Sequence, residues 1–137
     1  MASLIKDLET HLLLAAPVRG LVGRRVYGTQ IPDRQPLPYV RVEKASVEFE
    51  RFSTGKFEKA EVVITAYGET SEQAEALGRA VLARLEAPLF VSQPPRQTID
   101  CRPQDDATTA ESERGKDGLF RYAVPLTVRT TVYVPRS

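Results

Sequence analysis

The spacing of apolar residues predicts two amphipathic helices in this chain. In segments 3–16 and 71–86, apolar side chains recur every three or four residues and form one stripe. Pro17 is expected to end the first helix, because a proline ring clashes with the preceding turn. Thr70 and Gln73 form a capping box at the start of the second. The stripes consist of Leu4, Leu8, Leu12 and Ala15 in the first helix and Ala74, Leu77, Val81 and Leu85 in the second.

Alternation of apolar and polar residues predicts strands in the rest of the chain. They are expected at 24–27, 39–49, 59–67, 89–91, 97–102 and 120–134. Segment 59–67 carries apolar groups on both faces, which indicates a central strand. Pro125 cannot donate a ladder hydrogen bond, so the last strand is expected at an edge or bulged. The order of elements predicts an α+β fold, with an antiparallel sheet and two helices packed on one face.

Two polar segments are expected to be loops. Segment 50–58 is predicted to be a hairpin loop, and segment 103–118 a polar loop inserted in a single domain, 1–137. Neither has enough apolar residues to offset the entropy of ordering by packing on its own domain. The sequence therefore predicts that both loops lie at contacts with other chains.

Composition adds few constraints on function. The 137 residues suffice for about one domain, and 42% hydrophobic residues allow a real core. The net charge of +1 gives no overall attraction to nucleic acid or to acidic membranes. Acidic residues precede the short apolar run 12–16, so no signal peptide is expected, and no segment is long enough to span a bilayer. We expect a cytoplasmic protein without a membrane partner.

Candidate catalytic residues are few. His11 is the only histidine and Cys101 the only cysteine, so a nucleophilic triad or a typical zinc site lacks its ligands. Thr54-Gly55-Lys56 matches part of a phosphate loop but lies in the predicted hairpin. A structural role is expected for all of these residues, with no catalytic residue, cofactor or metal.

The densest basic point is the pair Arg24 and Arg25. Contact with nucleic acid phosphates is one reading, but no aromatic residues alternate with the basic ones. A solvated edge or a salt bridge to a neighbouring subunit is the favoured interpretation.

The chain resembles the tail terminator proteins of long-tailed bacteriophages, also called tail completion or head–tail joining proteins, with relatives in prophages and gene transfer agents. The resemblance covers the chain through Leu85, and beyond it only the final long strand. It rests on the helix with Leu4, Leu8 and Leu12, on the segments 21–27, 38–40 and 60–67, and on the helix that starts at 71–77.

The resemblance implies a small α+β subunit that assembles into a ring, typically a hexamer. Such a ring caps the growing tail tube and later joins it to the neck of the capsid, and DNA passes through its channel without sequence-specific binding. The implied partners are further copies of the chain, the tail tube protein and a head-completion or neck protein. The implied location is the virion, after assembly in the host bacterial cytoplasm.

Three other functions stay open at this stage. Another neck component, such as a head-completion or adaptor protein, would show a similar pattern. A nucleic-acid-binding module would need a basic face, and a small enzyme would need catalytic residues that the sequence does not offer.

Candidate interface residues come from the polar segments and the basic pair. An aromatic cluster at the hairpin is expected to anchor an interface, although its phenylalanines could instead fold back onto their own sheet. The candidates are Phe49, Arg51, Phe52, Lys56 and Phe57 in the hairpin, Arg24 and Arg25, and Asp105, Asp106, Glu113 and Arg114 in the second polar segment.

Overall fold

The computed structural model describes residues 4–28, 31, 36–86, 97–104, 109–114 and 120–136, with the backbone alone at 97–100. These residues form three helices and a mixed sheet of six strands. The helices are α1 (Leu4–Leu13), α2 (Ala16–Val22) and α3 (Ser71–Leu85). The strands are β1 (Val26–Tyr27), β2 (Tyr39–Phe52), β3 (Gly55–Gly68), β4 (Gln97–Pro103), β5 (Glu111–Arg114) and β6 (Phe120–Pro135). The expected strand 89–91 lies outside the described residues.

The sheet has the order β1-β2-β3-β6-β4, and β5 also pairs with β6. Strand β3 is central, as predicted, and all pairs except one are antiparallel. The exception is β1, which runs parallel to β2 with Val26 opposite Val40. The expectation of an antiparallel sheet is therefore wrong at this edge. Segment 28–38 separates the two strands along the chain.

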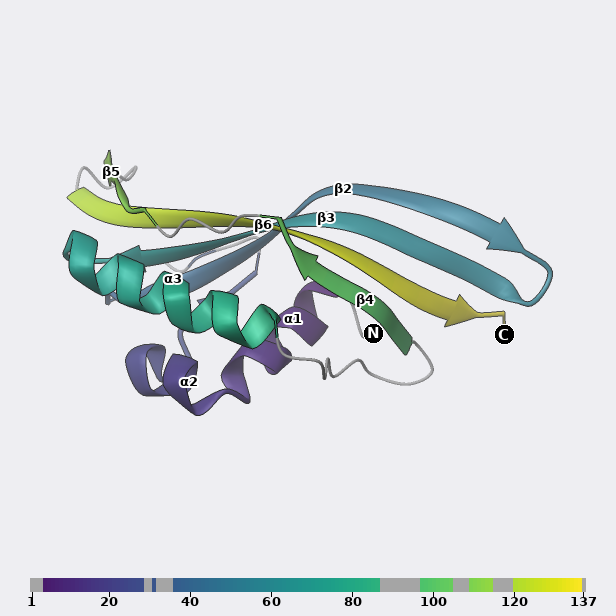
Figure 1. Ribbon diagram of the computed structural model, residues 1–137, viewed down its shortest axis with the longest axis horizontal. Helices are drawn as coiled ribbons and strands as arrows, with labels where there is room; N and C mark the ends of the chain where they lie inside the picture. The colour runs from purple at the N-terminus through teal and green to yellow at the C-terminus, as the bar shows by residue number, and fades with distance from the viewer. Residues whose placement is uncertain are drawn as a thin grey trace.

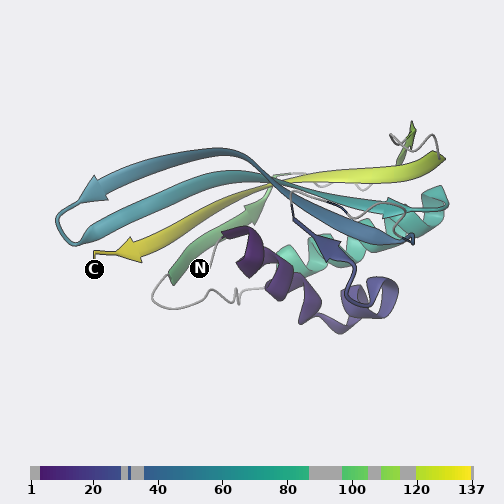
Figure 2. The ribbon, with the colours of Figure 1, turned by 180° about the vertical axis from the view of Figure 1, so that it is seen from behind.

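The N-terminal region forms two helices where one was expected. Pro17 does not end the helical region but lies in the first turn of α2, where its missing N–H costs nothing. Gly23 ends α2 with a φ of 63°, and its N–H donates to the Arg19 carbonyl oxygen at 2.8 Å. Figures 1 and 2 show α1, α2 and α3 on the same side of the sheet.

Helix α3 starts as its sequence predicts. The Thr70 hydroxyl accepts a hydrogen bond from the Gln73 N–H at 3.1 Å, and the Gln73 side chain accepts one from the Glu69 N–H at 2.7 Å. Farther along the helix, a Cβ added at Gly78 would lie 2.9 Å from Cγ1 of Val124 in β6. Helix α3 therefore lies so close to the sheet that a larger residue at position 78 would require Val124 to shift.

The hydrophobic core lies between the helices and the sheet. The sequence predicts five core residues, and all of them are buried in one cluster. They are Val62, Ile64, Leu77, Val81 and Leu85. The stripe of α1 joins the same cluster through Leu4, Leu8 and Leu12. A second, smaller cluster, Tyr39, Tyr67 and Ala123, lies apart from it. The period-based assignment of inward-facing residues is thus confirmed for both helices and the central strand, except for Ala15, which lies beyond α1 and is only partly buried.

Strand β6 is not an edge strand, contrary to the expectation from Pro125. It pairs with β3 from Tyr122 to Pro135, and Pro125 lies opposite Thr65. On its other side, β5 pairs with residues 120–123 and β4 with residues 128–133. Within the described part of the chain, Pro125 thus occupies the stretch of β6 that no strand covers on that side, where a missing N–H is tolerated.

The hairpin between β2 and β3 is longer and tighter than predicted. Both strands continue through the polar segment 50–58, and the turn consists of Ser53 and Thr54 alone. Ion pairs between the two strands join Lys59 to Glu50 at 3.1 Å and Lys44 to Glu58 at 3.2 Å. The expected loop is therefore wrong: these polar residues belong to solvated strands.

The second polar segment, 103–118, is also more regular than predicted. The strand β5 lies within it and pairs with the start of β6. The backbone N–H of Ala110 donates to the Glu75 carboxylate at 3.3 Å, which ties the segment to α3. The description of 103–118 as a loop is thus corrected at 111–114.

Two reciprocal hydrogen bonds between His11 and Arg84 join α1 to α3. His11 is buried, and its Nε2 donates to the Arg84 carbonyl oxygen at 3.2 Å. In return, Arg84 Nε donates to the His11 carbonyl oxygen at 2.8 Å. Burial lowers the pKa of His11 below the ordinary value of 6.5, and the nearby Arg84 guanidinium lowers it further. His11 is therefore a structural residue of the core.

This depressed pKa predicts a loss of stability in mild acid. The contribution of neutral His11 is complete above about pH 6.5 and falls as the pH drops below it, because the unfolded chain then binds the proton more readily. Chemical denaturation of the wild type and of His11→Asn between about pH 5 and pH 7 measures this effect. The variant is expected to be less stable and to show a flatter pH dependence. Equal slopes for the two proteins would contradict the assignment.

Candidate assembly interface

The hairpin candidates lie together at the end of an arm that extends beyond the helices. The arm consists of residues 47–60 of β2 and β3 and residues 130–136 at the end of the chain. Figures 1 and 2 show these strands continuing past the helices to the tip of the hairpin, close to the C-terminus. The arm bends toward the side on which the helices lie.

The register of the strands divides the candidates between the two faces of the arm. Alternate residues point to opposite faces, and residues paired across antiparallel strands share a face. Phe49, Arg51 and Lys56 lie on the helix-side face, the one that carries the core farther along the sheet. Phe52 and Phe57 lie on the outer face. The cluster of phenylalanines expected from the sequence is therefore split.

On the outer face, the aromatic rings pack on their own sheet. The ring centroid of Phe52 lies 5.1 Å from that of Phe57 and 6.1 Å from that of Tyr133. The rings of Phe57 and Tyr133 lie 6.0 Å apart, and the Tyr133 hydroxyl donates to the Thr54 carbonyl oxygen at 3.1 Å. The alternative in which phenylalanines fold back onto the sheet thus describes Phe52 and Phe57. The cluster also fixes the tip of the arm.

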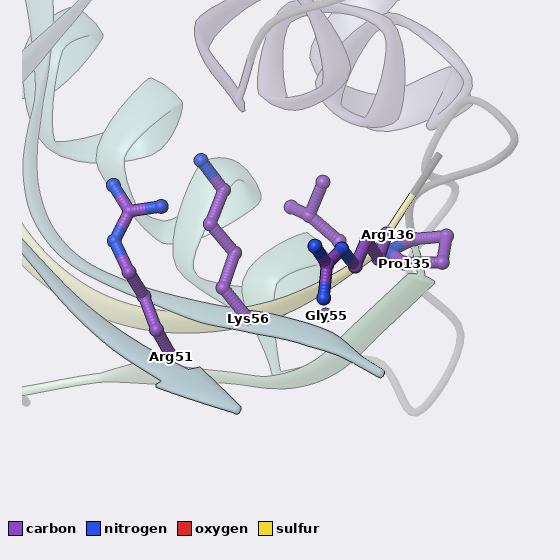
Figure 3. A pocket seen from close by; sticks show the side chains of 6 residues that line it. Arg51, Gly55, Lys56, Pro135 and Arg136 are labelled. Carbon is purple, nitrogen blue, oxygen red and sulfur yellow. The ribbon is translucent and has the colours of Figure 1, made fainter. Parts of the chain in front are cut away.

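On the helix-side face, an exposed ring lies among cations. Phe49 is 44% exposed, and Lys56 Nζ lies 4.5 Å and Arg51 Cζ 5.7 Å from its ring centroid. Arg51, Lys56 and Arg136, with the backbone of β6, line a hollow of about 440 Å³ (Figure 3). Among the described residues, no carboxylate forms an ion pair with any of these three cations. We refer to the three as the basic tip.

The candidates of the second polar segment lie at the other end of the sheet. Glu113 accepts hydrogen bonds from Arg121 at 2.8 and 3.3 Å, and Arg121 also donates to the Tyr39 hydroxyl at 2.7 Å. Arg114 lies 5.1 Å from the ring of Phe120, which is 70% exposed. Glu113 is thus used within the chain. Asp105 and Asp106 lie outside the described residues.

Arg121 connects this site to the smaller aromatic cluster. Its guanidinium lies 4.5 Å from the ring centroid of Tyr67, and the rings of Tyr67 and Tyr39 are 4.9 Å apart. Burial raises the pKa of Tyr67, and the charge of Glu113 acts in the same direction. The Tyr67 hydroxyl therefore stays neutral at physiological pH. Through Arg121, the cluster links β5 to the start of β2.

The basic pair lies beside β1, away from the arm. Arg25 Nε donates to the Pro38 carbonyl oxygen at 2.9 Å, whereas Arg24 is exposed. The structure thus places the candidate residues at three separate locations and gives Arg25 an internal role. The interface role of Arg24 stays a prediction.

Sequence reasoning missed the contribution of the last strand to the arm. Tyr133 and Arg136 complete the outer cluster and the basic tip, and both lie far from the hairpin along the chain. Only the pairing of β6 with β3 brings them there. Val47, 42% exposed on the helix-side face, was also missed.

The described residues hold no obvious site for chemistry. They contain no group of three or more metal-ligating side chains. Their helices are too short, or too polar, to cross a membrane.

Comparison with known proteins identifies the family. The sequence profile described as tail completion protein gp17 matches residues 6–131, and the chain belongs to this family. Comparison with curated protein sequences finds no significant match.

The fold is also found in a solved structure. A chain in the structure described as "Virion of native gene transfer agent (GTA) particle" superposes with a TM-score of 0.73 at 21% sequence identity. The match covers 96% of this chain and 96% of that chain. The arm and the helical layer therefore belong to one fold that spans nearly the whole sequence.

Proposed function

We propose that this chain is a structural virion protein that forms a ring, with six copies expected, at the end of a phage-type tail tube. The ring caps the tube and joins it to the head-completion or neck protein, and its channel lets DNA pass without sequence-specific binding. Membership in the tail completion family supports this role, as does the fold shared with a chain of a gene transfer agent virion.

The observation that carries the proposal is the arm. It extends past the helices and exposes an aromatic residue together with cations that form no ion pair with any described carboxylate, so it offers a contact surface to another chain. A ring requires two unlike surfaces on each subunit, and the arm and the body lie at opposite ends of the sheet (Figure 1).

The edge of the sheet offers a second contact surface. Strand β1 pairs only with Val40 and Arg41 of β2. Beyond these two residues, no other described strand pairs with that edge of β2. An open edge can accept a strand from another chain.

The proposed role requires no catalysis. His11 is occupied in the contact between α1 and α3, and Cys101 is half-buried against the core. Neither lies in an arrangement of nucleophile, base and orienting group among the described residues. Binding to copies of itself and to tube and neck proteins accounts for the surfaces that are present.

The experiment is to test assembly and capping together. Purified protein is expected to give a ring-sized species in light scattering and annular particles in electron microscopy. Added to tail tubes that lack a terminator, it is expected to bind one end of each tube and stop its elongation. Binding to capsids at the portal without binding to tubes would favour the alternative role of a head-completion or adaptor protein. A monomer that binds neither would refute both.

A further inference from the structure

We propose that the helix-side face of the arm docks on the β5 end of a second copy of this chain, so that the basic tip meets an acidic surface. The inference rests on the ring proposed above and identifies the contact that joins neighbouring subunits.

The docking face continues the core face of the sheet beyond the helices. Val42 and Val62 lie on this face and are fully buried. Toward the tip, Val47 and Phe49 follow on the same face and are 42% and 44% exposed. Neighbouring apolar side chains that lie beyond the core and remain exposed are typical of a contact surface.

The charge at the tip indicates what this face binds. Lys44 and Lys59, farther from the turn, pair with glutamates of the arm. Arg51, Lys56 and Arg136 have no such partner in the described part of the chain (Figure 3). Complementary potentials select partners and fix their orientation, so the face is suited to an acidic surface.

The chain itself carries an acidic surface at the far end. The Glu75 carboxylate accepts a hydrogen bond from Ala110, the residue before β5, which places the first turns of α3 beside β5. Glu72 lies one helical turn from Glu75 in the same helix. Among the described residues, no cation forms an ion pair with Glu72 or Glu75.

The two surfaces lie at opposite ends of the molecule. In β6, Val134 pairs with Lys56 of the arm, whereas Phe120 pairs with Arg114 of β5. Figure 1 shows the same separation between the hairpin tip and β5. A contact between unlike ends is heterologous, and it closes into a ring when successive rotations add to a full turn.

A nucleic acid partner explains less of the surface. Phosphates would pair with the basic tip but would leave the carboxylates at the β5 end without a partner. A second copy of the chain provides an oppositely charged partner for both surfaces, and it is therefore the proposed partner.

Charge reversal tests the contact. The tip variant carries Arg51→Glu and Lys56→Glu, and the surface variant carries Glu72→Lys and Glu75→Lys. Like charges across an interface are strongly unfavourable, so each variant alone is expected to associate about a hundredfold more weakly than the wild type in light scattering. Mixed in equal amounts, the two are expected to assemble again, alternating around the ring. A protein with all four reversals is expected to assemble by itself.

The matched control carries the same charge change on the other face of the sheet. Lys59→Glu and Arg129→Glu both lie on the outer face and are expected to leave association unchanged. Circular dichroism of each variant verifies that it is folded. Retained association in either reversed variant, failure of the mixture to assemble, or an equal loss in the control would overturn the proposal.

Two further outcomes separate the alternatives. If the tip variant associates normally but loses the binding to duplex DNA that the wild type shows, the basic tip serves nucleic acid and the docking contact is wrong. If the wild type stays monomeric at all concentrations and on tail tubes, the ring itself is refuted. If the wild type forms a ring and each reversed variant alone does not, both the proposed ring and the proposed contact between neighbouring subunits are supported.

Discussion

Leu77→Ala is expected to lower the free energy of unfolding by about 2–5 kcal/mol. Leu77 is fully buried in the main core, where α3 packs against the sheet. The cost of such a substitution rises with the volume of the cavity that remains, and collapse of the neighbours reduces it. The adjacent Gly78 already brings α3 close to Val124, so the helix has little room to move inward. We therefore expect a value in the upper part of the range.

Chemical denaturation of the wild type and the variant measures this cost. Leu14→Ala removes the same atoms from a side chain that is 52% exposed and serves as the control. The control is expected to change stability by no more than about 0.5 kcal/mol. A similarly small change for Leu77→Ala would show that the helix does not pack as described.

The helices and the core could be predicted because their signals are local. The apolar period of α3 and the cap at Thr70 and Gln73 lie within one stretch of sequence, and the structure confirms both. Pro17 shows the limit of such signals. A proline that follows one helix and a proline in the first turn of the next look alike in sequence, and only packing against the core decides between them.

The sequence predicts a loop at 50–58 because polar and charged residues dominate this part of the arm. Apolar alternation stops near Ala60, although the backbone ladder continues to Gly55. What stabilises the strands there is pairing with β6 and ion pairs between strands. These interactions join residues distant in sequence, so a window of hydrophobicity cannot detect them.

The candidate site could be predicted only in part, because the sequence shows which residues lie near the hairpin turn but not how the strands pair. The hairpin was correctly identified as a place where exposed aromatic and basic residues gather. Its division into two faces follows from the register, which the sequence leaves open. Tyr133 and Arg136 enter only through the pairing of the last strand.

Shortening of the hairpin that forms the outer part of the arm is expected to abolish assembly and tail capping while the domain stays folded. The deletion removes 49–52 and 55–58 and leaves Ser53 and Thr54 to connect Glu48 to Lys59, which are paired in the sheet. The main core, between the helices and the sheet, keeps all its buried residues, because none lies within the deleted segments. Circular dichroism and thermal unfolding are expected to show a cooperative fold, and light scattering a monomer.

A full-length control separates loss of the arm's contacts from loss of its ion pair. Glu50→Gln with Lys59→Gln removes a surface ion pair, which contributes little to stability, and keeps the strands and the basic tip in place. This variant is expected to form rings and to cap tubes as the wild type does. A truncated protein that still assembled on tail tubes would show that the body alone carries the contacts. Loss of assembly in the truncated protein, with a normal control, would place those contacts on the arm, since the two proteins share the same helices and core.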